Sequence, residues 1–206
     1  FTRDQLVVSG TMDEDRINII VAHWPSRSGG QAKSEPRRIQ AAQLGRKIID
    51  SLLAVDPSSK IILMGDLNDD PVNKSVKDYI RAKAKVKKMK DGDMYNTMYD
   101  KYKQGDCTLA YRDAWNLFDQ LIISEGLTGN DCSSFVFHKS YVYNKPYLRQ
   151  KRLSIWLITY WHRICFWNSV RKRRKLFAFM MGSSSSDFIS PTEPPGCAPN
   201  RKRNSK

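Results

Sequence analysis

The stretch that decides the fold is residues 60–71, KIILMGDLNDDP. A run of apolar residues and one glycine leads into Asp66, and polar side chains at positions 68, 69 and 70 follow before Pro71. A continuous apolar run of this kind is typical of a strand that is buried on both faces. Acidic residues at the end of such a strand indicate a helix start, a metal-binding loop or a site that processes phosphate.

The interpretation as a calcium loop fails at two positions. An EF-hand loop that begins at Asp66 requires glycine at its sixth position and a bidentate glutamate at its twelfth. The chain has Pro71 and Lys77 at these positions. A helix start would account for the last two aspartates, which favour the positive end of the helix dipole, but it leaves Asp66 and Asn68 unexplained.

The segments on the N-terminal side of this stretch alternate between strand and helix patterns. Residues 5–10 and 16–23 predict two strands joined by a turn. Residues 34–54 predict one long helix, with Ser34 as its N-cap and Pro36 in its first turn. A strand, a long helix and a further strand in this order predict an α/β layered domain.

The segments on the C-terminal side give weaker patterns. Residues 73–90 predict a helix whose lysines form a solvated face, and residues 91–106 predict a long loop with a short helix. Apolar runs within 115–124 and 133–143 predict two more strands. No apolar segment reaches the roughly 20 residues of a transmembrane helix, and the four cysteines lack the spacing of a zinc site.

The positive charge is concentrated near the C-terminus. The chain has a net charge of +14, but residues 149–206 alone hold 13 Lys and Arg against two Asp and Glu. The rest of the chain is nearly balanced, so its charge gives no strong attraction for nucleic acid. We therefore divide the chain into a domain at 1–151 and a largely disordered basic and aromatic tail at 152–206. Two interpretations of the tail stay open: a native nucleic-acid-binding or amphipathic segment, and the product of a shifted reading frame.

Polar groups lie at the ends of three predicted strands: His23, then Asp66 with Asn68, then Asp119. The ordered set IIVAHWPSR, SEPRRIQAAQLGRKIID, IILMGDLNDDP and WNLFDQLIIS resembles the endonuclease/exonuclease/phosphatase superfamily, which has the deoxyribonuclease-I-like fold. The motifs HWPSR and GDLNDDP resemble those of a bacterial subgroup of this superfamily. This resemblance implies an α/β fold over 1–151, part of a four-layer αββα sandwich with two mixed sheets flanked by helices.

The resemblance also implies catalytic roles. Asp66 would orient or deprotonate the attacking water, and Asn68 would donate a hydrogen bond to the phosphate as charge builds on its oxygens. His23 would contact the scissile phosphate or assist proton transfer. Asp119 would orient a second histidine, as the buried aspartate of a catalytic triad fixes its imidazole.

The resemblance implies a cofactor and a substrate class as well. The cofactor would be Mg²⁺ or Mn²⁺, with Asp66 and Asn68 as ligands, and Ser26 and Arg27 are candidates to hold the anionic substrate. The substrate would be a phosphate ester: nucleic acid, sugar phosphate or phospholipid headgroup. The sequence indicates neither the compartment nor the oligomeric state.

The chain also departs from the family pattern. The family's N-terminal asparagine and metal-binding glutamate would precede residue 1, and no Ser-Asp-His sequence occurs. We therefore expect a fragment of the family domain, with impaired hydrolysis of phosphate esters. The alternative is a non-catalytic fragment that binds nucleic acid through the basic tail, or an interaction module that keeps only the fold.

Overall fold

The structure is a computed structural model. It describes residues 2–12, 14–111, 114–129 and 134–143, together with short strands at 150–151, 156–157, 161–168 and 175–180. Within these ranges, no helix has the length and apolar character needed to span a membrane. Most of the predicted disordered tail, 152–206, lies outside the described residues, and so do Cys132 and Cys197.

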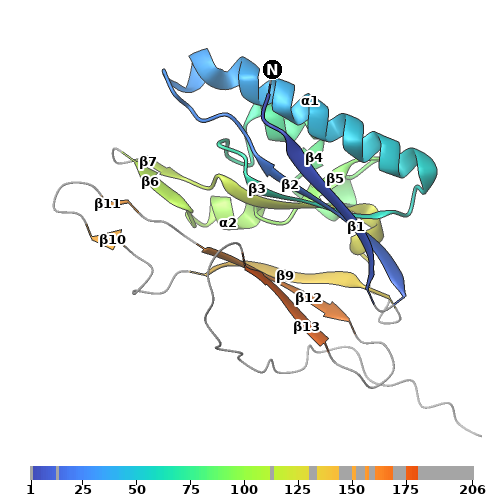
Figure 1. Cartoon of the computed structure of the whole chain (residues 1–206). Coiled ribbons are helices and arrows are strands. Elements are labelled where there is room, and N and C mark those ends of the chain that lie inside the picture. The colour runs from blue at the N-terminus through green and yellow to red at the C-terminus, as the bar shows by residue number, and fades with distance from the viewer. Residues whose placement is uncertain are drawn as a thin grey trace, which may run out of the picture.

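A mixed sheet of six strands forms the centre of the molecule (Figure 1). Strand β2 pairs in parallel with β3, while β3 pairs in antiparallel fashion with β8. The order across the sheet is β1 (Gln5–Met12), β2 (Asp15–His23), β3 (Lys60–Asp66), β8 (Asp119–Ser124), β5 (Met94–Asn96) and β4 (Ala82–Lys83). The strands predicted around residues 5–10, 16–23 and 60–66 are confirmed. The apolar side chains of β2 and β3 are largely buried, as expected inside a sheet that is covered on both faces, whereas β1 is an edge strand with exposed apolar side chains.

The long helix α1 (Gln31–Val55) covers one face of this sheet (Figure 1). The helix is confirmed, but its predicted start is wrong by three residues. Gly29 and Gly30, with φ angles of 82° and 102°, turn the chain into the helix, a backbone conformation that glycine adopts without steric cost. The hydroxyl of Ser34 therefore lies inside the helix and donates to the Gly30 carbonyl at 2.7 Å, and Pro36 also lies within the helix.

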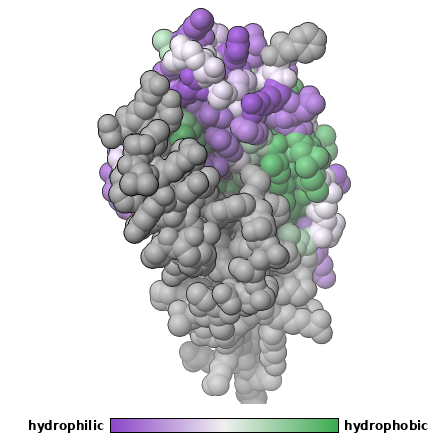
Figure 2. All heavy atoms as spheres, turned by 60° about the vertical axis from the view of Figure 1, so that its left-hand side comes forward, coloured by the Kyte–Doolittle hydropathy of each residue, from purple (hydrophilic) through white to green (hydrophobic). Residues whose placement is uncertain are grey.

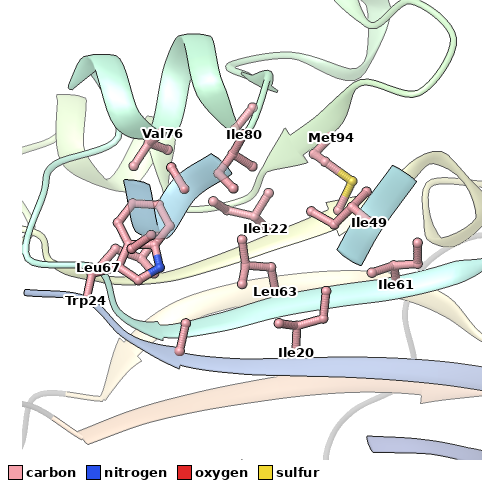
Figure 3. Packing of buried hydrophobic residues seen from close by; sticks show 14 residues of the cluster. Ile20, Trp24, Ile49, Ile61, Leu63, Leu67, Val76, Ile80, Met94 and Ile122 are labelled. Carbon is pink, nitrogen blue, oxygen red and sulfur yellow. The ribbon is translucent and has the colours of Figure 1, made fainter. Parts of the chain in front are cut away.

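Two apolar clusters fill the two faces of the sheet. The first lies between the sheet, α1 and the short π-helix η1 (Ser75–Tyr79), and Figure 3 shows Leu63 and Ile122 of the sheet below Ile80 of the segment after η1. The second lies on the opposite face, where Phe137 of β9 (Val136–Tyr143) packs against it. The six-stranded sheet is therefore covered on both sides, as an α/β layered domain requires.

A second sheet lies on the side of the first sheet opposite to α1 (Figure 1). Its order is β13 (Lys175–Met180), β12 (Trp161–Asn168) and β9, all antiparallel. The α/β fold of two sheets with helical cover is thus confirmed, with three layers among the described elements. Strands β6 (Leu109–Tyr111) and β7 (Ala114–Asn116) form a separate hairpin. Strands β10 (Gln150–Lys151) and β11 (Trp156–Leu157) form another antiparallel pair, and the 3₁₀ turn η3 (Glu125–Leu127) follows β8.

The single helix predicted for residues 73–90 is wrong. The segment contains η1, then β4, then a 3₁₀ turn η2 (Val86–Lys88). Arg81 has a φ of 62°, which ends any helix, and no apolar stripe continues beyond Ile80. The short helix predicted in the following loop is confirmed as α2 (Tyr99–Lys103).

Candidate active site

Three of the four predicted catalytic residues form one row across adjacent strands. His23 at the end of β2 is the register partner of Asp66 on β3, and Asp66 is the register partner of Asp119 on β8. Register partners on neighbouring strands point to the same face of a sheet. Met64, two residues before Asp66, packs in the cluster opposite α1. The row therefore faces the side of the second sheet.

Asp66 is the centre of this row. Its Oδ2 lies 3.8 Å from the Nε2 of His23, and its Oδ1 accepts a 2.9 Å hydrogen bond from the backbone N–H of Asn68. Burial and the neighbouring carboxylate of Asp119 raise the pKa of Asp66 above its ordinary value. Such a carboxylate favours a cation or a proton beside it.

Asp119 is the more enclosed of the two carboxylates. Burial raises its pKa, although a hydrogen bond with the Thr108 hydroxyl and the nearby imidazole of His23 act in the opposite direction. The same hydroxyl accepts a hydrogen bond from the Asp119 backbone N–H at 3.2 Å. Among the described residues, the imidazole that affects the pKa of Asp119 is therefore that of His23. The predicted hydrogen bond of Asp119 with a second histidine stays a prediction.

Asn68 is held in an unusual backbone conformation next to the row. Its φ of 50° lies in the left-handed region, which asparagine tolerates better than most residues. Its side-chain amide donates to the Trp24 carbonyl at 2.9 Å. This bond uses one of the two amide N–H groups, and the predicted contact of Asn68 with a phosphate stays a prediction.

Gly65 allows the two strands that carry His23 and Asp66 to approach closely. It has a φ of 133°, and a Cβ at this position would lie 1.9 Å from the carbonyl oxygen of Ala22. Only glycine can occupy this position without moving β2 away from β3. The glycine before Asp66 is therefore part of the site geometry.

Arg27 ties the loop after β3 together. Its Nε donates to the Asn68 carbonyl at 2.9 Å, and its Nη2 lies 3.3 Å from Asp69 and 3.1 Å from Asp70. The guanidinium also lies 4.3 Å from the ring centroid of Phe118, a cation–π contact. These contacts are all within the protein, and the predicted contact of Arg27 with substrate stays a prediction.

The last two aspartates of the loop are buried anchors rather than a helix start. Asp69 is fully buried, and its carboxylate pairs with Arg38 of α1 at 2.8 Å and accepts from the Ser75 hydroxyl at 2.6 Å. Asp70 accepts from the backbone N–H of Leu117 at 2.7 Å, while burial raises its pKa. The loop is thus fixed to α1 and to the chain before β8.

A hollow of about 550 Å³ opens over the row, and we call it the carboxylate hollow. It is lined by Asp4, Gln5, Leu6, Val21, Ala22, His23, Asp66 and Asp119. The sequence reasoning missed Asp4. Gln5 pairs with Ala22, and the next position in this antiparallel register places Asp4 opposite His23. A prediction that β1 pairs with β2 in this register would therefore have identified Asp4.

The donor set fits a hard divalent cation with few protein ligands. No group of three or more His, Cys, Asp and Glu side chains is arranged to hold a metal in the described part of the chain. Mg²⁺, however, is commonly held by one or two carboxylates, with waters and substrate phosphate oxygens completing its shell. Asp66 and Asp119 supply two such carboxylates. A cation between them would offset both the burial and the charge of Asp119, which together raise the pKa of Asp66.

Similar proteins come from solved structures and from one family model. Truncated Caenorhabditis elegans TDP2 is 12% identical over 77% of this chain and 61% of its own, with a TM-score of 0.46. A Bacteroides thetaiotaomicron mannosyl-6-phosphatase is 16% identical over 71% and 48%, with a TM-score of 0.43. Sphingomyelinase C from Streptomyces griseocarneus is 13% identical over 84% and 52%, with a TM-score of 0.43. The chain thus spans less than two thirds of the length of each.

No curated protein sequence matches this chain. The model of the endonuclease/exonuclease/phosphatase family matches residues 1–156, which include the row and the loop after β3. Since this match covers well over half of the 206 residues, the chain belongs to the endonuclease/exonuclease/phosphatase family.

Proposed function

We propose that the carboxylate hollow is a site for metal-dependent hydrolysis of phosphate esters. The observation that carries this proposal is the row of His23, Asp66 and Asp119, which the register of three adjacent strands places side by side. Two carboxylates and an imidazole on one sheet face are groups that can bind a cation and move a proton.

Asp66 is the proposed base or orienting group for the attacking water, because its pKa is raised and it lies centrally in the row. His23 is largely exposed, with 63% of its side chain accessible, and it is placed to contact the phosphate or transfer a proton. The second amide N–H of Asn68 would donate to the phosphate as charge builds on its oxygens.

Asp66 and Asp119 would hold Mg²⁺ or Mn²⁺, and Asn68 is a further candidate through its amide oxygen. A bound divalent ion would neutralise charge on the phosphate and lower the pKa of a bound water. Asp119 would keep the His23 imidazole close through its charge. Because the described row offers only two carboxylates, we expect weak metal affinity and slow turnover.

The test is to measure Mn²⁺ binding and Mn²⁺-dependent hydrolysis of bis(p-nitrophenyl) phosphate by the full chain. We expect a slow hydrolysis that chelation abolishes and that Asp66→Asn reduces by at least about a hundredfold. The matched control is Asp91→Asn. Asp91 is an exposed aspartate before β5, and its substitution removes the same charge far along the sheet.

An equal loss of hydrolysis in both variants would mean that the loss comes from the change in net charge, which would contradict the assigned role of Asp66. A rate of hydrolysis that is unchanged in Asp66→Asn, or that does not depend on the metal, would overturn the proposal. The alternative function, nucleic-acid binding by the tail, rests on residues of 152–206 that lie mostly outside the described part of the chain.

A further inference from the structure

A second hollow, of about 490 Å³, is lined by residues from the start of the chain, the loop after β2 and helix α1. We call it the cationic hollow. Its lining consists of Thr2, Arg3, Pro25, Ser26, Ser28 and Arg37. These residues offer two guanidinium groups and three hydroxyl groups, and no carboxylate. Such a lining is suited to a phosphate, which accepts hydrogen bonds from guanidinium and hydroxyl groups.

Arg3 and Arg37 form no ion pair with another residue that the structure describes. Four other arginines form ion pairs, with a guanidinium nitrogen 2.5 to 3.3 Å from a carboxylate oxygen of an aspartate: Arg27, Arg38, Arg46 and Arg81. Among the described residues, neither Arg3 nor Arg37 forms such a pair, and both side chains are exposed. Their charge is therefore available to a ligand.

The start of α1 adds to the positive potential of the cationic hollow. Ser28 lies just before the N-cap residue Gly30, and the first turn of α1 contains no acidic residue. The N-terminus of a helix of this length carries a partial positive charge. Hydrophilic side chains gather at the end of the molecule that α1 covers, at the top of Figure 2.

The cationic hollow and the carboxylate hollow are lined by neighbouring residues of the same two segments. Arg3 lines the former and Asp4 the latter, and Ser26 follows His23 by three positions. A 2.9 Å bond from the Trp24 backbone N–H to the Asp66 carbonyl fixes the second segment to β3. The guanidinium of Arg3 is close enough to Asp66 to act on the pKa of that carboxyl group.

We propose that the cationic hollow binds a second phosphate of the substrate through Arg3 and Arg37, with Ser26 and Ser28 as hydroxyl donors. This inference rests on the proposed function, in which the scissile phosphate lies at the row of His23, Asp66 and Asp119. The preferred substrate class is then a phosphate ester with another phosphate close to the scissile one. A nucleic-acid strand and a small bisphosphate share this chemistry.

The test compares ligands that differ by one phosphate, by titration calorimetry on the full chain with a metal chelator present. The pairs are TpT against pTpT, and glucose 6-phosphate against glucose 1,6-bisphosphate. In the unsubstituted chain the added phosphate should strengthen binding about tenfold in at least one pair. The pair with the larger gain identifies the source of the second phosphate.

The gain should vanish in the double variant Arg3→Gln/Arg37→Gln. The matched control is Arg16→Gln, because Arg16 is also exposed but lies at the opposite end of β2 from His23. A gain that survives in the double variant, an equal loss in the control, or no gain in either pair would overturn the proposal.

Failure of this inference can be told apart from failure of the proposed function. Asp66→Asn should abolish the hydrolysis but keep the gain from the second phosphate. If hydrolysis depends on Asp66 while the double variant binds every ligand normally, the second phosphate site is wrong and the proposed function stands. If the double variant loses the gain but Asp66→Asn hydrolyses normally, the phosphate site stands and the proposed function is wrong.

Discussion

The guanidinium of Arg38 and the carboxylate of Asp69 form an ion pair of 2.8 Å in which both side chains are fully buried. Arg38 comes from α1 and Asp69 from the loop after β3, so the pair fastens the helix to the loop that carries Asn68. Arg38 also donates to the Ser34 hydroxyl at 2.7 Å. A buried charge that keeps only part of its partners is costly.

Arg38→Met should therefore destabilise the protein by about 3–5 kcal/mol, because it leaves the Asp69 carboxylate buried with its main partner removed. Denaturant unfolding would measure the loss. The control is Arg37→Met on the same helix, whose side chain is exposed and whose replacement should change stability by less than about 0.5 kcal/mol. Equal effects of the two substitutions would show that Asp69 does not depend on Arg38.

Gly65→Ala should destabilise the chain and also disturb the site. The strained backbone alone should cost about 1–3 kcal/mol, and the new methyl group would collide with the Ala22 carbonyl. Gly10→Ala is the matched control, since Gly10 is also in a strand but has open space around it. Thermal unfolding of the two variants would test this, and similar melting temperatures would contradict it.

Asp119→Asn should change how stability depends on pH. Burial raises the pKa of Asp119 in the folded state above the ordinary 3.8, so the folded chain binds this proton more tightly than the unfolded chain. The stability that comes with this proton is present below the unfolded pKa and is lost as the pH rises through the folded pKa. The variant has no carboxyl group at position 119 and does not lose this stability. As the pH rises through this range, its melting temperature should therefore rise relative to that of the unsubstituted chain.

Melting temperatures measured from about pH 3 to about pH 8 in chelator would show this gain. Asp91→Asn, which alters an exposed carboxyl group, should keep a nearly constant difference from the unsubstituted chain. A constant difference for Asp119→Asn as well would mean that its carboxyl group is not penalised by burial.

Asn68→Ala should be less stable than Asn68→Gly. Both variants leave the Trp24 carbonyl without its 2.9 Å donor, but alanine must also adopt the left-handed φ of 50°. We expect alanine to cost about 1 kcal/mol more than glycine, as measured by denaturant unfolding. The reverse order would show that the loop changes conformation when the amide is lost.

The central strands and the row could be predicted from the sequence, because an apolar run indicates a strand and polar residues at strand ends meet at one edge of a sheet. The anchoring of Asp69 could not, since nothing in the pattern shows that Arg38, within the buried stripe of α1, has a carboxylate partner. The hydrogen bonds of Thr108 with Asp119 could not be predicted either, because a single threonine in a loop gives no periodic pattern. In residues 73–90 the lysines suggested a helix face, but tertiary contacts and the positive φ of Arg81 decided otherwise.

The row of His23, Asp66 and Asp119 has a consequence for how the protein acquires its chemistry during folding. Its members come from distant parts of the chain, and the parallel pair β2–β3 can form only with α1 as the crossover between its strands. Contacts of such long range form slowly, because closing the loops between them costs entropy before they are stabilised. A chain with α1 formed but β8 unpaired would hold Asp119 away from Asp66. If the proposed metal site is present, the recovery of Mn²⁺ binding during refolding would therefore report when the central sheet is complete.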